Sequence, residues 1–111
     1  MHAFDVLGDP VRRRILELLA RGELSAGSLT GVIQKDFGIT QAGVSQHLRA
    51  LRESGFVRVR IEGPRRIYSV DSKPFQEVDA WISQFRGFWE QRLHALTREI
   101  AQAKSRRRGR S

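Results

Sequence analysis

A single segment, from Thr40 to Gly55, constrains the fold of this chain more than any other part of its sequence. Thr40 is a favourable N-cap, because its hydroxyl can accept a hydrogen bond from the first turn of a helix, and Gly55 is a typical helix stop. Val44, Leu48 and Leu51 follow at helical spacing, so one face of this helix is apolar. The opposite face carries Ala42, Ser45, Gln46 and Arg49. Small and hydrogen-bonding side chains with one arginine, in place of Glu and Lys pairs, indicate a face that contacts another molecule.

Two further helices are expected before this segment. Asp9 and Pro10 begin the first, since aspartate caps a helix and proline lacks only an N–H that the first turn leaves unpaired. Its apolar positions are Val11, Ile15, Leu18 and Leu19, and Gly22 closes it. Ser25 caps the second helix, which ends near Phe37 and Gly38. Gly27 and Gly31 each weaken that helix by about 1 kcal/mol relative to alanine.

The sequence after Gly55 predicts a hairpin and then a long helix. Residues 56–61 and 66–70 are rich in β-branched and aromatic side chains that alternate with a period of two, as strands do. The turn Glu62-Gly63-Pro64-Arg65 joins them and gives the hairpin a basic tip. Pro74 opens a helix that continues to about Ala103, a length of about 45 Å. The predicted fold is therefore mainly α with a small β-hairpin wing (α+β).

Two helices joined by a short turn form a helix-turn-helix, and the second of them fits the DNA major groove. In that groove Gln46 suits adenine, Arg49 suits guanine, and Ala42 can meet a thymine methyl group. Arginines of the hairpin suit phosphates or the minor groove beside the helix. The full set of expected DNA contacts is Thr40, Gln41, Ala42, Ser45, Gln46, Arg49, Arg58, Arg65 and Arg66. Double-stranded DNA is the expected partner.

The charge distribution supports a polyanionic partner. The 111 residues carry a formal charge of +8, and residues 40–70 hold six arginines against two acidic residues. Five more basic residues lie in the last eight positions, so we expect one winged helix-turn-helix domain over residues 1–103 and a disordered basic tail over 104–111. The chain has no cysteine, no apolar run long enough for a bilayer and no export signal at its N-terminus. We therefore expect a cytoplasmic location, no membrane association and no cofactor.

Four stretches resemble the ArsR/SmtB-type winged-helix repressors. They are Gly8-Asp9-Pro10-Val11-Arg12-Arg13-Arg14-Ile15-Leu16, Glu23-Leu24-Ser25, Val44-Ser45-Gln46-His47-Leu48-Arg49-Ala50-Leu51-Arg52-Glu53-Ser54-Gly55-Phe56-Val57, and Glu62-Gly63-Pro64-Arg65-Arg66-Ile67-Tyr68. The resemblance covers residues 4 to 100. It implies a homodimer that binds an imperfect inverted repeat over a promoter, and that dimerises through its first and last helices.

The chain departs from that family at the sensor. Many members have Cys-x-Cys where this chain has Ser25 and Gly27, and others place Asp and His ligands where this chain has Trp81, Arg92 and Ala95. His94 with Glu90 and a carboxylate from a partner chain is the remaining alternative for a metal site, against an ordinary exposed helix pair. We therefore expect a branch of the family that does not sense metal, with an effector that the sequence does not identify.

An apolar stripe on the last helix predicts the dimer interface. The remaining body, about seventy residues, is too small to cover so much aromatic surface, and two-fold self-association covers it most simply. The expected interface is Phe4, Val78, Trp81, Ile82, Phe85, Phe88, Trp89, Leu93 and Leu96. The alternative is that the stripe packs inside its own domain.

Three other functions are alternatives to sequence-specific DNA binding. The sequence shows no nucleophile–base pair and no phosphate-binding glycine loop, so we expect that the protein is not an enzyme. An architectural DNA-binding protein with little sequence preference would have the same charge and tail. The third alternative is a winged-helix domain that binds proteins, and its function would persist after Gln46→Ala and Arg49→Ala.

Overall fold

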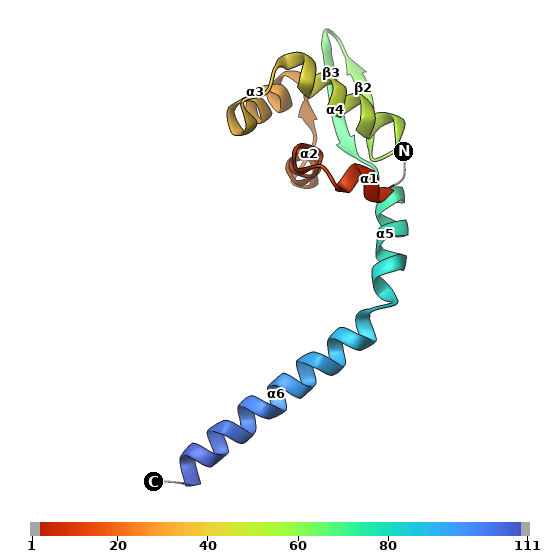
Figure 1. Ribbon diagram of the computed structural model, residues 1–111. Helices are drawn as coiled ribbons and strands as arrows, with labels where there is room; N and C mark the ends of the chain where they lie inside the picture. The colour runs from red at the N-terminus through yellow and green to blue at the C-terminus, as the bar shows by residue number, and fades with distance from the viewer. Residues whose placement is uncertain (1–2, 110–111) are drawn as a thin grey trace. The chain divides into compact units, whose positions relative to one another are not determined.

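The computed structural model describes residues 3–109, and these form two compact units that divide between Val78 and Asp79. In chain order the first unit holds α1 (Ala3–Leu7), α2 (Pro10–Ala20), β1 (Leu24–Ser25), α3 (Ala26–Phe37), α4 (Gln41–Glu53), β2 (Val57–Glu62), β3 (Arg65–Val70) and the start of α5 (Lys73–Ser83) (Figure 1). The rest of α5 and α6 (Arg86–Gly109) form the second. The predicted fold class, mainly α with a β-hairpin wing, is confirmed.

Side-chain caps begin the helices of the first unit where the sequence predicts. The Asp9 carboxylate accepts hydrogen bonds from the N–H groups of Val11 (2.8 Å) and Arg12 (3.1 Å) at the start of α2. Ser25 accepts from the N–H of Ser28 to cap α3, and Thr40 accepts from the N–H of Gly43 to cap α4. Each cap satisfies an N–H that the helix leaves unpaired, so the start of each helix is specified locally.

The turn between α3 and α4 depends on Gly38. This residue ends α3 in the left-handed conformation (φ 65°) and donates its N–H to the carbonyl of Gln34. Residues with a Cβ rarely adopt that conformation. A tight reversal at this point holds α3 and α4 against each other, as a helix-turn-helix requires.

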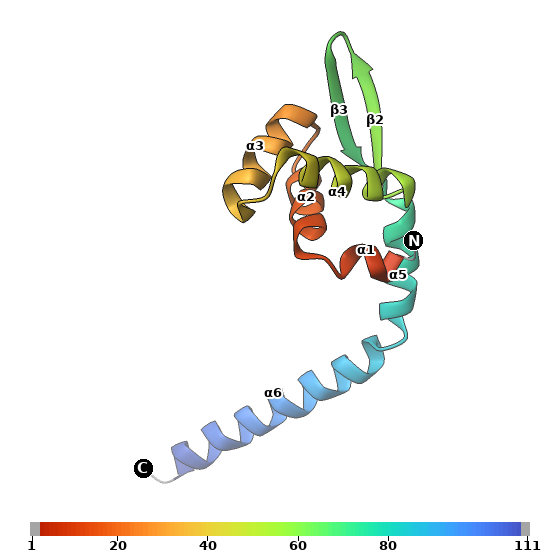
Figure 2. The ribbon, with the colours of Figure 1, turned by 45° about the horizontal axis from the view of Figure 1, so that its top comes forward.

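The sheet has three antiparallel strands in the order β1-β3-β2, and the two-residue β1 is an element that the sequence analysis missed. Leu24 pairs with Tyr68 and Ser25 with Ile67. This pairing connects the start of α3 to β3, the central strand of the sheet. Glu62 pairs with Arg65, so Gly63 and Pro64 alone make the turn. A positive φ at Gly63 (59°) followed by proline fits a type II′ turn. The β2–β3 hairpin extends out from the helical body (Figure 2).

One hydrophobic core lies among the helices and the base of the hairpin. Its fully buried side chains are Val6, Ile15, Leu29, Ile33, Val44, Leu51 and Phe56. Phe75 of α5 contacts the ring of Phe56 edge to face, with the ring centroids 5.1 Å apart. Val78 is partly buried and packs against this core, and its place in the dimer interface stays a prediction. The core holds the apolar face of α4 and leaves its polar face outside.

The second unit differs from the single long helix expected from Pro74 to Ala103. The helix breaks at Gln84 and Phe85, whose N–H groups donate to the carbonyls of Trp81 and Ile82 three residues earlier. The side chains of Ser83 and Gln84 also donate to carbonyls of this last turn, which competes with helix continuation. α6 then runs to Gly109, so most of the segment expected to be disordered is helical, consistent with the high helix propensity of Arg and Lys.

The described side chains from Asp79 to Arg107 are all exposed, so the second unit has no core of its own within the single chain. Among the residues that the structure describes, no helix combines the length and apolar character that a membrane span requires.

Candidate nucleic-acid interface

The helix α4 presents the polar face that the sequence predicts. Val44, Leu48 and Leu51 are buried, with at most 4% of their surface exposed. The predicted contact residues that begin or lie on α4 are all exposed: Thr40, Gln41, Ala42, Ser45, Gln46 and Arg49. The side chains that anchor α4 are therefore separate from those that can contact a partner. The polar face of α4 can therefore contact a partner without any change in the packing of the core.

A groove of about 570 Å³ lies beside this face, between α3, α4 and β3. Its α4 wall includes Gln41, Ser45, Arg49 and Arg52, and β3 contributes Arg66 and Tyr68. Its α3 wall is Ala26, Gly27, Thr30, Gly31 and Gln34. The structure thus brings Gln41, Ser45, Arg49 and Arg66 together, whereas Ala42 and Gln46 lie on α4 outside the groove. Arg52 is not among the predicted DNA contacts, although its spacing of three from Arg49 places it on the same face of α4.

Two of the groove arginines, Arg52 and Arg66, form no ion pair with the rest of residues 3–109, whereas Arg49 does. The Nε of Arg49 lies 2.9 Å from a carboxylate oxygen of Glu53, and both side chains are well exposed, at 73% and 61%. An exposed pair one helical turn apart contributes only about 0.3–0.5 kcal/mol. This contact orients Arg49 but is weak enough to exchange for a stronger partner.

Arg65 and Arg66 follow each other on β3, so their side chains leave the sheet on opposite faces. Arg66 pairs across the hairpin with Ile61, whose side chain is 75% exposed, and shares a face with Tyr68 above the groove. Arg65 pairs with Glu62 at the turn. The tip of the hairpin therefore carries a positive charge on each face of the wing. Of these two arginines, only Arg66 lines the groove beside α4.

The other arginines of the hairpin are engaged within the protein. The Nε of Arg58 lies 2.8 Å from a carboxylate oxygen of Asp71. The N–H of Lys73 and then the side chain of Arg58 hold the pKa of Asp71 below its usual value. Arg60 pairs with Glu62 and Glu23, which raise its pKa. Arg58, expected to contact DNA, is thus placed outside the groove.

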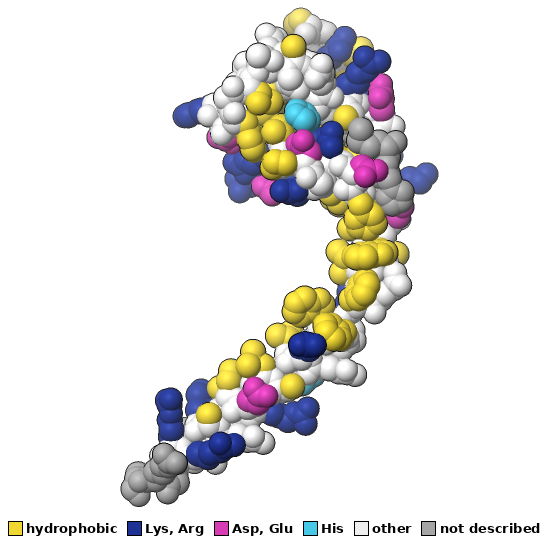
Figure 3. Space-filling view, in the orientation of Figure 1, with side chains coloured by type: hydrophobic (Ala, Val, Ile, Leu, Met, Phe, Trp, Pro, Cys, Tyr) yellow, Lys and Arg dark blue, Asp and Glu magenta, His cyan; other side chains and the backbone are white. Residues whose placement is uncertain are grey.

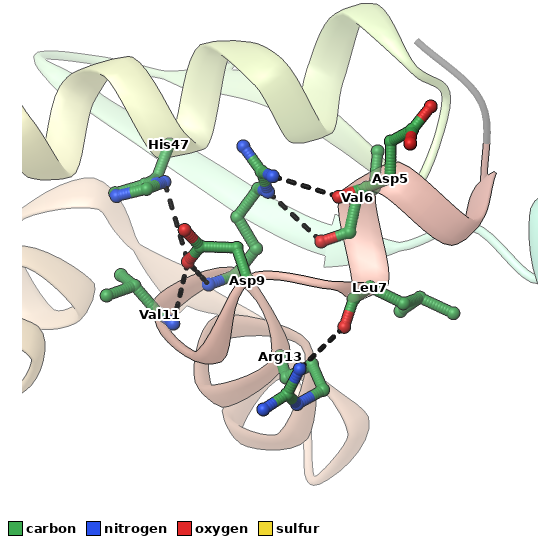
Figure 4. A network of polar contacts seen from close by, with 8 residues as sticks. Asp5, Val6, Leu7, Asp9, Val11, Arg13 and His47 are labelled. Carbon is green, nitrogen blue, oxygen red and sulfur yellow. Dashed lines mark hydrogen bonds and ion pairs between the residues drawn. The ribbon is translucent and has the colours of Figure 1, made fainter.

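Asp9 connects the start of α2 to α4 (Figure 4). The Nδ1 atom of His47, on α4, lies 3.9 Å from the Asp9 carboxylate that caps α2. Burial would raise the pKa of Asp9, but the N–H groups of Arg12 and Val11 and the charge of His47 outweigh it, so this pKa is lowered. His47 therefore packs between helices, as its place at the apolar edge of α4 predicts.

Apolar side chains gather over α5 and the first turns of α6 (Figure 3). The predicted interface residues of this region are exposed by 43% to 60%: Trp81, Ile82, Phe85, Phe88, Trp89, Leu93 and Leu96. Phe4, on α1 in the first unit, is 39% exposed. Trp89, Leu93, Leu96 and Ile100 follow one another at helical spacing, so they form a continuous stripe along α6. These side chains are not core of the single chain.

Within residues 3–109 no three His, Cys, Asp or Glu side chains lie close enough together to hold an ion. The alternative site at His94 and Glu90 takes its third ligand from a partner chain and stays a prediction. The two positions at which the resembled family often has Cys-x-Cys serve different structural roles here. Ser25 caps α3 and Gly27 lines the groove.

Known proteins share this sequence and this fold. A family model described as a helix-turn-helix domain matches residues 7–60. The transcriptional repressor SdpR of Bacillus subtilis (strain 168) is 30% identical over 84 residues, which are 76% of this chain and 89% of SdpR. In the crystal structure of an ArsR family transcriptional regulator, the match covers 79% of this chain and 87% of that chain, with 31% identity and a TM-score of 0.66.

A homodimeric winged helix-turn-helix DNA-binding domain from Mycobacterium bovis shares the fold at 24% identity and a TM-score of 0.57, over 76% of this chain and 77% of that chain. The predicted resemblance is confirmed by these relatives. The chain therefore belongs to the ArsR family of winged helix-turn-helix transcriptional regulators.

Proposed function

We propose that this protein is a homodimeric repressor that binds an inverted-repeat operator and inserts α4 of each subunit into the major groove. The observation that carries this proposal is the exposed polar face of α4, fixed by buried Val44, Leu48 and Leu51. Ser45, Gln46 and Arg49 then meet base edges, and each good contact of this type discriminates by about 1–3 kcal/mol. Its own promoter is a candidate operator.

In this proposal the hairpin supplies contacts that do not depend on sequence. Arg65 and Arg66 are exposed and form no ion pair with other described residues, so their charge is available for phosphates. Arg58 is held by Asp71 in the free protein, and because its side chain is exposed it can exchange this contact for a phosphate, as Arg49 exchanges Glu53 for a base. The basic residues at the end of α6, from Lys104 onward, add a nonspecific attraction.

The exposed stripe on α6 makes the second part of the proposal, the homodimer. Trp89, Leu93, Leu96 and Ile100 form an apolar surface that a second copy can cover, which gives a two-fold interface. A dimer also holds two α4 helices at a fixed separation, and an inverted repeat with half-sites about 34–36 Å apart requires this.

We further propose that divalent metal does not regulate this repressor at the positions used by metal-sensing relatives. Ser25 supplies a capping hydroxyl and Gly27 no ligand at all, while Trp81 and Arg92 offer none of the donors that transition metals prefer.

The test begins with purified full-length protein and fragments of the genome it comes from. Recovered fragments are measured against random duplex by fluorescence anisotropy at one stated salt concentration. The proposal expects a preference of about a thousandfold or more, unchanged by zinc or by a chelator. Equal affinity for both duplexes identifies an architectural DNA-binding protein, and no affinity for either contradicts a DNA-binding function.

A further inference from the structure

Ile61 of β2 has the most exposed large hydrophobic side chain among the residues that the structure describes, at 75%. Val57 and Val59 precede it at alternate positions of the strand, so all three share one face of the sheet. Val57 is buried in the core and Val59 packs against it. The apolar face of β2 therefore continues past the core onto the free part of the wing, where Ile61 lies mostly in solvent.

A single exposed apolar side chain is ordinary on a protein surface, and it is the position of Ile61 that distinguishes it. Ile61 pairs across the hairpin with Arg66, and residues directly opposite each other lie side by side on one face. Arg66 and Tyr68 share that face and line the groove beside α4. Ile61 therefore extends the candidate DNA surface outward along the wing, next to an arginine that makes no ion pair within residues 3–109.

The chemistry of a duplex restricts what an isoleucine at this place can contact. A phosphate gives an apolar side chain no favourable interaction. The apolar surfaces of a duplex are the thymine methyl groups of the major groove and the sugar edges that form the walls of the minor groove. In the proposed function α4 occupies the major groove, and the wing extends away from α4 (Figure 2). The minor groove, about 6 Å wide, admits single side chains, and isoleucine is among those that proteins insert there.

We propose that Ile61 contacts the walls and floor of the minor groove beside each half-site, next to Arg66, and selects A·T base pairs there. This inference rests on the proposed function, since it concerns the same duplex whose bases α4 reads. The amino group of guanine projects from the floor of this groove, so a G·C pair keeps Ile61 away from the floor. An A·T pair presents only acceptors, which suit the donors of Arg66. The narrow minor groove of A·T-rich DNA also attracts arginine through its more negative potential.

A base analogue separates reading of the minor groove from other effects of sequence. Inosine lacks only the amino group of guanine, so an I·C pair has the minor-groove face of A·T and the major-groove face of G·C. Operator duplexes with A·T, G·C or I·C at the base pairs flanking each half-site are titrated with full-length protein by anisotropy. G·C flanks lower wild-type affinity by about tenfold or more, because each of two wings loses the burial of about one methylene group. I·C flanks restore most of this loss.

Ile61→Thr tests the side chain, and Ile61→Val is its matched control. Threonine and valine keep the branching at Cβ that favours a strand, and at an exposed position both variants melt close to wild type. Ile61→Thr reduces the preference for A·T over G·C flanks to about threefold or less, whereas Ile61→Val keeps it. The salt slope of binding is unchanged in both variants, because neither substitution removes a phosphate contact.

The possible failures are distinguishable. If wild-type affinity does not depend on the flanks, or if I·C behaves as G·C does, Ile61 does not read the minor groove, although the proposed function stands. If Ile61→Thr keeps the full preference for A·T, another residue reads the flanks and the inference is wrong. If wild type binds no duplex at all, the proposed function fails together with this inference.

Discussion

Replacement of Arg49 by alanine tests whether α4 reads bases. In the free protein Arg49 is held by Glu53 at 2.9 Å, and both side chains are exposed. A bidentate contact with guanine is worth about 1–3 kcal/mol, and the ion pair given up for it about 0.3–0.5 kcal/mol. The exchange of the ion pair for the base contact is therefore favourable by about 0.5–2.7 kcal/mol. Arg49→Ala consequently lowers operator affinity by about 2- to 100-fold.

Random duplex offers no fixed guanine, so it loses much less affinity than the operator does. Glu53→Gln releases Arg49 and leaves operator affinity equal to wild type or raises it by about twofold. Arg14→Ala serves as the control, because this arginine pairs with Glu17 and Asp36 and does not line the groove. Anisotropy titrations of both duplexes at one salt concentration measure these effects. Equal losses on operator and random DNA, or a large loss with Glu53→Gln, would refute the assignment of Arg49 to a base.

Three other substitutions examine the interface, the wing and the acid limit of stability. Trp89→Ala removes the largest side chain of the α6 stripe and weakens the dimer by about 30-fold or more in sedimentation equilibrium; a dimer as tight as wild type would place this tryptophan elsewhere. Arg65→Ala and Arg66→Ala each reduce the salt slope of DNA binding by about 0.9, and a slope that does not change removes that residue from the phosphate contacts. Asp71 has a lowered pKa when folded, so it stabilises the protein at neutral pH and loses this contribution as pH falls below about 4. Asp71→Asn therefore lowers the free energy of unfolding, measured with urea, more at pH 7 than at pH 3, and an equal effect at both would contradict the pKa assignment.

The parts of this fold that the sequence predicted are those determined by neighbouring residues. Asp9, Ser25 and Thr40 are within three residues of the N–H groups that they cap, so the starts of α2, α3 and α4 are visible in the sequence. The polar and apolar faces of α4 likewise follow from helical spacing alone.

Features that depend on distant partners were not predictable in the same way. The two residues of β1 are too few to show periodicity, and only their pairing with β3 makes them a strand. Arg58 and Arg60 alternate correctly on β2, but nothing near them indicates that Asp71 and Glu23 hold them. Val78 continues the apolar spacing of the stripe, and only the folded structure shows that it also packs against the core of the first unit.

The candidate site was predictable on α4 and incomplete on α3. Ser45, Gln46 and Arg49 were identified because the outer face of α4 carries small and hydrogen-bonding side chains with one arginine, in place of Glu and Lys pairs. Gly27 and Gly31 were recognised only as weak points of a helix, since their common place on the groove depends on how α3 packs beside α4.

A footprint on a selected operator tests the central claim, a dimer that reads DNA with α4, most directly. Hydroxyl-radical cleavage of each strand is compared for wild type and for Arg49→Ala over a titration of protein concentration. We predict two protected half-sites related by two-fold symmetry, with centres about 10–10.5 base pairs or a multiple of that apart, and the same protection in the variant only at concentrations about 2- to 100-fold higher. Continuous protection without symmetry, or protection of both half-sites at the same protein concentrations in Arg49→Ala as in wild type, would contradict the account.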